Sequence, residues 1–235
     1  MKKLVFNVVV ITTGFFGAFN KVEAQQGLQI GFEANPQLSY LVNKDDRDSK
    51  LYSAKSATGG HFGVSAQYGI TSKIGVGLNL LYSFQGSLYE WKGQEKVKSL
   101  QYIKIPLMLT LNLPFGSSGK MLFIGKIGPQ ISALVDARLY DGNAKLLDNN
   151  YKRAFAFTDF GGVISAGVGY KFSEQFSFDG SVRFDGGFLE AEDKSYKGNI
   201  HDPSDVINPS PASSPRHNAY NMTVGLNLGI RYTFL

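Results

Sequence analysis

Residues 220–234 read YNMTVGLNLGIRYTF and alternate strictly between two kinds of side chain. The even positions, from Tyr220 to Phe234, all hold apolar or aromatic side chains, whereas the odd positions hold only Asn, Thr, Gly or Arg. Such alternation is typical of a β-strand with one apolar and one polar face. It continues well beyond the roughly 5–6 residues of an ordinary soluble strand. It therefore predicts a membrane-spanning strand, with the apolar face toward lipid and the polar face toward the lumen of a barrel.

Seven further segments alternate in a similar way. The pattern is clear in residues 28–40, 61–68, 74–85 and 176–185. It is less regular but readable in residues 100–113, 121–135 and 157–172. Together with the last segment they predict an all-β domain over residues 25–235, an eight-stranded antiparallel transmembrane β-barrel.

The lengths of the connections give independent support to this topology. Short connections alternate with long ones along the chain. The short ones lie near residues 69–73, 114–120 and 173–175. The long ones run over residues 41–60, 86–98, 136–154 and 189–218. Outer-membrane barrels have short periplasmic turns and long extracellular loops, so both termini are expected in the periplasm.

Aromatic residues fall at the two expected membrane interfaces, where they form girdles in outer-membrane barrels. The short-turn end holds Tyr68, Tyr170, Phe172, Phe176, Tyr232 and Phe234. The long-loop end holds Tyr40, Tyr82, Phe84, Phe184 and Tyr220. The alternative is a soluble β-sandwich or lipocalin-like barrel whose apolar faces point inward. The girdles and the strand lengths favour the membrane barrel.

The start of the chain predicts export. Lys2 and Lys3 precede an apolar stretch over residues 4–19, and the small residues Val22 and Ala24 stand where a signal peptidase reads. This is the pattern of a cleavable signal peptide over residues 1–24. A transmembrane anchor is the alternative, but the apolar stretch is short of the roughly 20 residues that a spanning helix needs. The predicted location is therefore the cell outer membrane.

Charged residues occupy the face opposite the apolar one. Four are acidic and four are basic: Glu33, Asp159, Asp179 and Asp185 against Lys104, Lys126, Arg183 and Arg231. The lumen of an eight-stranded barrel is only just wide enough for its own side chains, and buried charges must be paired. We therefore expect a plug of ion pairs, including one between Glu33 and Arg231 across the first and last strands. The alternative is a proton or solute path along the same charges.

Three motifs resemble one family of barrels. Residues 102–109, YIKIPLML, resemble a strand of the PorT-like outer-membrane β-barrel family in which a tyrosine precedes isoleucine-proline-leucine. Residues 124–129, IGKIGP, are similar to the glycine-rich strand that follows it, and residues 159–161 and 167–170 to the next. The resemblance extends over most of residues 28–235. It implies an eight-stranded outer-membrane barrel, usually of unassigned function, with a few relatives in a secretion and gliding apparatus.

Partners follow from this prediction. The barrel contacts outer-membrane lipid, and the barrel assembly machinery inserts it. That machinery commonly reads a terminal aromatic residue, whereas here Phe234 is penultimate and Leu235 is terminal. The long loops are the expected contact surface for an envelope protein complex or an extracellular ligand. The basic residues form no stripe, so no nucleic acid is expected.

Enzymatic chemistry has one weak candidate. His61 and Ser65 share the predicted lumen face of one strand, and Asp185 lies at a similar height on another. A base, a nucleophile and an acid of this kind could serve a lipid-modifying enzyme. A simpler explanation is that these are polar residues at the rim of the barrel with no catalytic role. The chain has no Cys, which excludes thiolate sites, and no motif predicts a metal or cofactor. The sequence favours a non-enzymatic scaffold, binding or accessory subunit, with a lipid-modifying enzyme or a narrow pore as alternatives.

Overall fold

Eight long antiparallel strands close into one ring. The computed structural model describes residues 27–44, 53–91, 94–141, 144–146, 151–193 and 218–234. The ring consists of β1 (Leu28–Asn43), β2 (Ser53–Gly69), β3 (Ile74–Trp91), β4 (Gln94–Phe115), β5 (Met121–Asp141), β7 (Thr158–Lys171), β8 (Phe176–Gly187) and β9 (Ala219–Thr233). A short ninth strand, β6 (Ala144–Leu146), pairs with β5 alone among the described strands. The predicted eight-stranded barrel is confirmed, whereas the predicted signal peptide lies outside the described residues.

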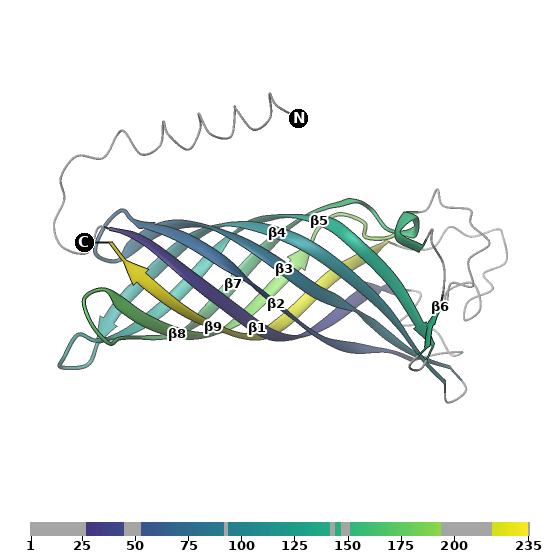
Figure 1. Ribbon diagram of the computed structural model, residues 1–235, viewed down its shortest axis with the longest axis horizontal. Helices are drawn as coiled ribbons and strands as arrows, with labels where there is room; N and C mark the ends of the chain where they lie inside the picture. Colours follow the sequence, from purple (N-terminus) through teal and green to yellow (C-terminus); the bar gives the residue numbers. More distant parts are fainter. Residues whose placement is uncertain are drawn as a thin grey trace, which may run out of the picture.

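The ring closes where β1 pairs with β9, and the other neighbours in the ring follow one another along the chain. Closure leaves no strand edge of the ring unpaired. An unpaired edge would expose backbone N–H and C=O groups to lipid, where they have no hydrogen-bond partner. Figure 1 shows the strands strongly tilted to the long axis, with β1 beginning and β9 ending at the same end of the barrel. No helix in the described ranges is long and apolar enough to cross a membrane.

The short connections are tight turns closed by hydroxyl groups. Thr71 Oγ1 accepts hydrogen bonds from the backbone N–H of Lys73 and of Ile74. Ser173 Oγ does the same for Gln175 and Phe176 in the turn between β7 and β8. Ser and Thr favour turns because their hydroxyl can bond the backbone two or three residues further along. These residues fix where one strand stops and the next begins.

The alternation seen in the sequence separates two environments. Along β1, Ile30 and Phe32 are 45% and 50% exposed on the outer face, whereas Glu33 and Asn35 are 3% and 2% exposed inside. The same inversion runs around the ring, with large apolar side chains outside and polar ones buried. A soluble barrel would bury its apolar face, so the outer belt is built for lipid.

Four strands extend well beyond their predicted ends, because part of residues 41–60, 86–98 and 136–154 is strand and not loop. β2 begins at Ser53, β3 reaches Trp91, β4 begins at Gln94 and β5 continues to Asp141. Bulges or register shifts interrupt β2 between Ser56 and Gly60 and β4–β5 at Gln101 and Tyr102. Above the membrane the outer face meets water, so the apolar pattern fades while the backbone ladder continues.

The upper lumen holds an apolar cluster that the sequence analysis did not predict. Its buried members are Leu41, Leu100, Tyr102, Leu134, Ala137, Leu139, Phe155, Ala191 and Ala219. Phe155 follows the 3-10 helix η1 (Tyr151–Ala154), and the backbone of this segment pairs with that of Glu192. The segments above β7 and β8 therefore fold inward and place apolar side chains over the mouth of the barrel.

Candidate functional site: the barrel lumen

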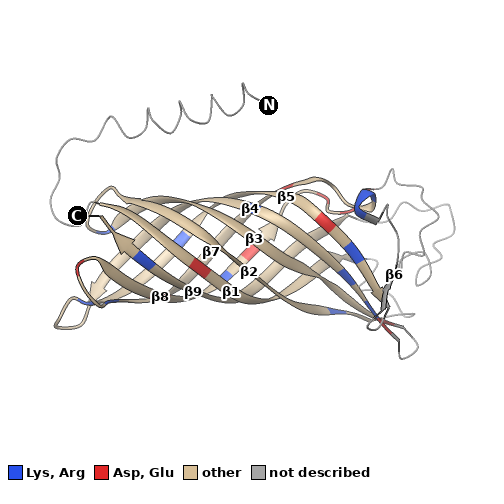
Figure 2. Cartoon of the chain, viewed as in Figure 1, with Lys and Arg blue, Asp and Glu red and all other residues tan. Residues whose placement is uncertain are grey.

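All eight predicted lumen charges are buried inside the barrel. Their exposed fractions range from 2% for Asp179 to 9% for Lys126. Figure 2 shows acidic and basic positions interleaved along the strands, not gathered on one side. The set holds four acids and four bases, and each buried charge needs an opposite charge or hydrogen-bond partners beside it.

One group of ion pairs centres on Arg183 of β8. Its Nε donates to Asp185 Oδ1 at 2.9 Å, and its Nη1 lies 3.5 Å from Glu33 Oε1 on β1. Lys104 of β4 reaches Asp185 Oδ2 at 3.3 Å. Thr223 Oγ1 of β9 donates to the same oxygen at 3.2 Å. Four strands are thus joined across the lumen by one connected network.

A second group centres on Asp179 of β8. Its Oδ2 lies 3.3 Å from Lys126 Nζ on β5, and its Oδ1 lies 2.5 Å from Arg231 Nη2 on β9. The predicted pair between Glu33 and Arg231 is not formed. In the register, Arg231 faces Gly31 on β1 and Ser177 on β8, and its guanidinium reaches Asp179 instead.

Neutral amides complete the network, and sequence reasoning did not single them out. Asn79 Nδ2 and Asn227 Nδ2 donate to the two oxygens of Glu33, at 2.6 and 3.4 Å. In the described part of the chain, Asp159 is bonded by the Asn221 amide at 3.2 Å and not by a cation. Like the charged residues, they occupy alternate positions on the lumen-facing side of their strands. That alternation could have identified them from the sequence.

Further pairs lie above the membrane on both faces of the extended strands. Inside, Lys98 Nζ lies 3.2 Å from Glu192 and 5.0 Å from the centre of the Tyr89 ring. Lys98 falls in the predicted loop over residues 86–98, although it is an even number of positions from Lys104, as lumen-facing residues of one strand are. Outside, Lys55 bonds Glu90, and this hydrogen bond raises the pKa of the Lys55 ammonium.

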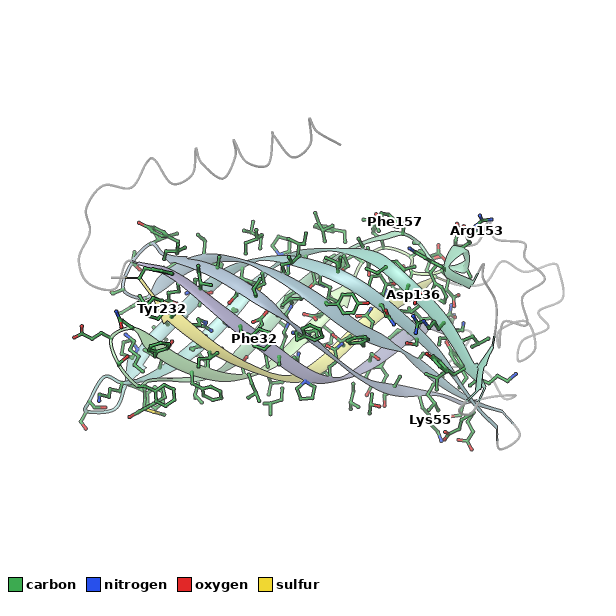
Figure 3. All side chains as sticks on the ribbon, in the orientation of Figure 1. Phe32, Lys55, Asp136, Arg153, Phe157 and Tyr232 are labelled. Carbon is green, nitrogen blue, oxygen red and sulfur yellow. The ribbon has the colours of Figure 1, made fainter. Side chains whose placement is uncertain are left out.

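The predicted aromatic residues lie on the outer face. Near the short turns the Tyr232 ring contacts Phe176 and Phe234 with centroids 5.1 and 5.0 Å apart, and Tyr170 contacts Phe172 at 5.2 Å. Figure 3 shows Tyr232 near this end of the barrel. The other predicted members are exposed or half-buried on the outer face: Tyr40, Tyr68, Tyr82, Phe84, Phe184 and Tyr220. That these residues form two interfacial girdles stays a prediction.

The structure does not assemble the three candidate catalytic residues into one site. Asp185 interacts with His61 electrostatically, but its carboxylate is bonded to Arg183 and Lys104. His61 Nδ1 lies 3.1 Å from Gln37 Oε1, so an amide and not a carboxylate orients the ring. Ser65 is four residues further along the same strand, which separates the two by about 13 Å at the usual strand rise. Across the ranges that the structure describes, no group of His, Cys, Asp or Glu side chains is arranged to hold a metal ion.

Comparison with known proteins agrees with the fold. The model of the family described as outer membrane protein beta-barrel domain matches residues 10–201. The chain resembles OprG from Pseudomonas aeruginosa at 13% identity, covering 89% of this chain and 96% of OprG, with a TM-score of 0.49. It also resembles Neisserial surface protein A at 15% identity, with 88% and 97% covered and a TM-score of 0.45. Ail of Yersinia pestis follows at 11% identity, with 88% and 99% covered and a TM-score of 0.42. No curated protein sequence matches the chain.

Proposed function

The chain belongs to the outer membrane protein β-barrel family, and from that premise we propose that it is a non-enzymatic scaffold or binding subunit of the cell envelope. Its lipid-facing belt anchors it in the outer membrane. Its lumen stays closed, and its extracellular loops contact an envelope protein complex or an extracellular ligand. The barrel is a fixed platform for those loops.

The ion pairs inside the lumen carry this proposal. Arg183, Asp185, Glu33 and Lys104 cross the lumen at one level, and Asp179 joins two cations at another. A water-filled channel keeps its charges hydrated, whereas these side chains are nearly inaccessible to solvent. Because the network spans the lumen between opposite walls, it supports a filled interior and not a conducting one.

The apolar cluster adds a second closure at the extracellular mouth. Phe155 is 5% exposed and packs in one cluster with Tyr102, Leu100 and Leu139 from β4 and β5. A hydrated solute entering from this side would have to displace these side chains from one another. The interior is therefore better suited to holding the barrel rigid than to transport, and the working surface is the outside.

The motifs that resemble PorT-like barrels bear on the scaffold part of this proposal. Two of its motifs lie on β4 and β5, where Tyr102 and Lys104 point into the lumen and Ile103 and Ile105 face lipid. These residues build the wall and its filling. The resemblance therefore concerns the scaffold, and the partner is expected to bind the loops.

Purification from native outer membranes in a mild detergent tests the proposal. Mass spectrometry should find defined envelope proteins at stoichiometric levels with the barrel. A matched variant, in which residues 196–215 are replaced by a short Gly/Ser linker, should fold but lose them. A lone wild-type barrel would contradict the stable-complex role. Discrete conductance steps of the wild type in planar bilayers would contradict the closed lumen and favour the narrow pore.

A further inference from the structure

Exposed phenyl rings gather on the outside of the barrel at the loop end of β7 and β8. Phe157 lies just before β7 and Phe188 just after β8, and they are 65% and 64% exposed. These are the highest values among the large apolar side chains of the described ranges. The Phe160 ring of β7 lies beside that of Phe188, with the ring centroids 6.3 Å apart. We call Phe157, Phe160 and Phe188 the outer aromatic patch.

The backbone makes this patch part of the barrel wall. The Phe157 carbonyl accepts a hydrogen bond from the Leu134 N–H of β5 at 2.7 Å, and the Phe188 N–H donates to the Phe160 carbonyl at 2.8 Å. The Phe188 ring lies against the backbone of Gly162, because a Cβ added at Gly162 would be only 3.2 Å from the ring carbon Cζ. The rings are thus held in place while they are exposed, and such a patch marks a contact with a partner or with membrane.

Two cations stand directly beyond the patch, on η1. Lys152 and Arg153 are both exposed, and Lys152 Nζ lies 5.9 Å from the centre of the Phe157 ring. Figure 3 shows Arg153 and Phe157 at the same edge of the barrel, with Arg153 nearer to its end. Within the described ranges, neither cation forms an ion pair with a carboxylate.

Other outer cations at this end differ in that respect. Lys55 of β2 bonds Glu90, and Arg138 Nε of β5 lies 2.6 Å from Asp136 Oδ2. In the view of Figure 3, Lys55 lies at the edge of the barrel opposite Arg153. The positive charge that no described acid offsets therefore lies on the side of the barrel that also carries the outer aromatic patch.

This arrangement of charges and rings fits one kind of ligand. Arginine and lysine both bind phosphate, arginine through two parallel hydrogen bonds. A soluble anion would use the two cations and leave the rings in water. A lipid with a phosphorylated headgroup uses both parts, because its acyl chains cover the rings while its phosphate meets the cations. In the outer leaflet of an outer membrane, that lipid is lipid A.

We propose that Lys152, Arg153 and the outer aromatic patch form a binding site for one phosphorylated lipid A molecule of the outer leaflet. The two cations bind a phosphate group, and acyl chains lie along Phe157, Phe160 and Phe188. The site goes beyond the proposed scaffold role and rests on the same orientation, with η1 on the extracellular side. A lipid bound there fixes the segments above β7 and β8 relative to the membrane surface.

Native mass spectrometry of the purified, delipidated full-length barrel in a mild detergent tests the site. Bis-phosphorylated lipid A should bind the wild type more tightly than the same lipid with its phosphates removed. The double variant Lys152→Gln/Arg153→Gln should bind it roughly tenfold more weakly, since each cation near an anionic lipid contributes to binding. Lys55→Gln/Arg138→Gln is the matched control, because it also removes two outer cations, and it should bind lipid A as the wild type does. The shift on unheated gels verifies that each variant is folded.

A second pair of variants tests the apolar half of the site. Phe188→Gln should weaken lipid A binding several-fold, because it removes apolar contact area from the acyl chains. Phe172→Gln is its control, since Phe172 is 58% exposed but lies at the short-turn end of the barrel. That control should bind lipid A as the wild type does, and equal losses in the two variants would contradict a localised site.

Three results of these experiments would overturn the proposal. One is equal binding of phosphorylated and dephosphorylated lipid A, or equal losses in the two double variants. Another is displacement of lipid A by inorganic phosphate at the same concentration, which would assign the cations to a free anion. The third is intact lipid A binding by Lys152→Gln/Arg153→Gln together with loss of co-purifying envelope proteins, which would assign the patch to a protein. Because lipid binding is measured on the isolated barrel, it can fail or succeed independently of the scaffold role.

Discussion

At the scale of single residues, Asp179 shows why the lumen depends on pairing. Its carboxylate is 2% exposed and stands between the Lys126 ammonium and the Arg231 guanidinium. Taking three charges out of water is costly, and their mutual attraction offsets that cost only while all three are present. Removing the one anion would leave two buried cations facing each other.

The substitution Asp179→Asn is therefore expected to destabilise the barrel by about 3–5 kcal/mol. The measurement is urea unfolding of the barrel in lipid vesicles, followed by its shift on unheated gels. The matched control is Asp136→Asn, which breaks the 2.6 Å pair with Arg138 on the outer face. Exposed pairs contribute little, so the control should leave the midpoint nearly unchanged. Equal effects of the two substitutions would argue against a tightly closed ionic lumen.

At the scale of the strand, close backbone approach constrains β2 at Gly63. A Cβ added there would lie 2.0 Å from the Leu80 carbonyl oxygen of β3 and 2.8 Å from the Leu81 Cα. Gly63→Ala should therefore force the two strands apart and cost about 1–3 kcal/mol, as overpacking does. Gly125→Ala on β5 is the control, since the nearest atom is Leu111 Cβ at 4.0 Å. The unfolding midpoints of the two variants test this prediction. A Gly63→Ala midpoint equal to that of the wild type would contradict the tight packing of β2 on β3.

The outer face of β7 offers a test of depth in the membrane. Ile164 lies in the middle of the belt, 54% exposed, whereas Thr158 lies on the same face at the extracellular end of the strand. An arginine at the midplane costs about 2–4 kcal/mol, and one near the interface about 0–1 kcal/mol. Ile164→Arg should therefore reduce the free energy of unfolding in vesicles far more than Thr158→Arg does. Similar costs at both positions would mean that this face does not span the bilayer.

The strands within the membrane could be predicted from the sequence, because lipid demands an apolar side chain at every second position. Above the membrane that demand ends, and residues such as Lys55 and Lys98 lie on strands that no apolar pattern marks. The ion-pair partners could not be predicted for a different reason. The tilt of the strands and the reach of long side chains decide which charges meet, so Arg231 binds Asp179 although Glu33 is nearly opposite it.

At the scale of the whole molecule, the barrel separates its two ends. Among the described residues, one end has tight turns closed by hydroxyl groups, and the other has extended strands, η1 and the apolar cluster over the mouth. Figure 3 shows Arg153, Phe157 and Lys55 toward this second end. A closed and rigid cylinder of this kind transmits little between its ends. A partner bound by the extracellular loops would therefore be anchored to the outer membrane without any signal through the lumen.

The orientation of the cylinder can be tested with single cysteines, because the native chain has none. Lys152→Cys places a thiol on η1, and Ser117→Cys places one in the exposed turn between β4 and β5. A bulky maleimide-polyethylene glycol that cannot cross the outer membrane should label Lys152→Cys on intact cells. It should label Ser117→Cys only after the membrane is permeabilised, because short turns face the periplasm. If Ser117→Cys were the one labelled on intact cells, the long loops would face the periplasm and the proposed extracellular partner would have no surface to bind.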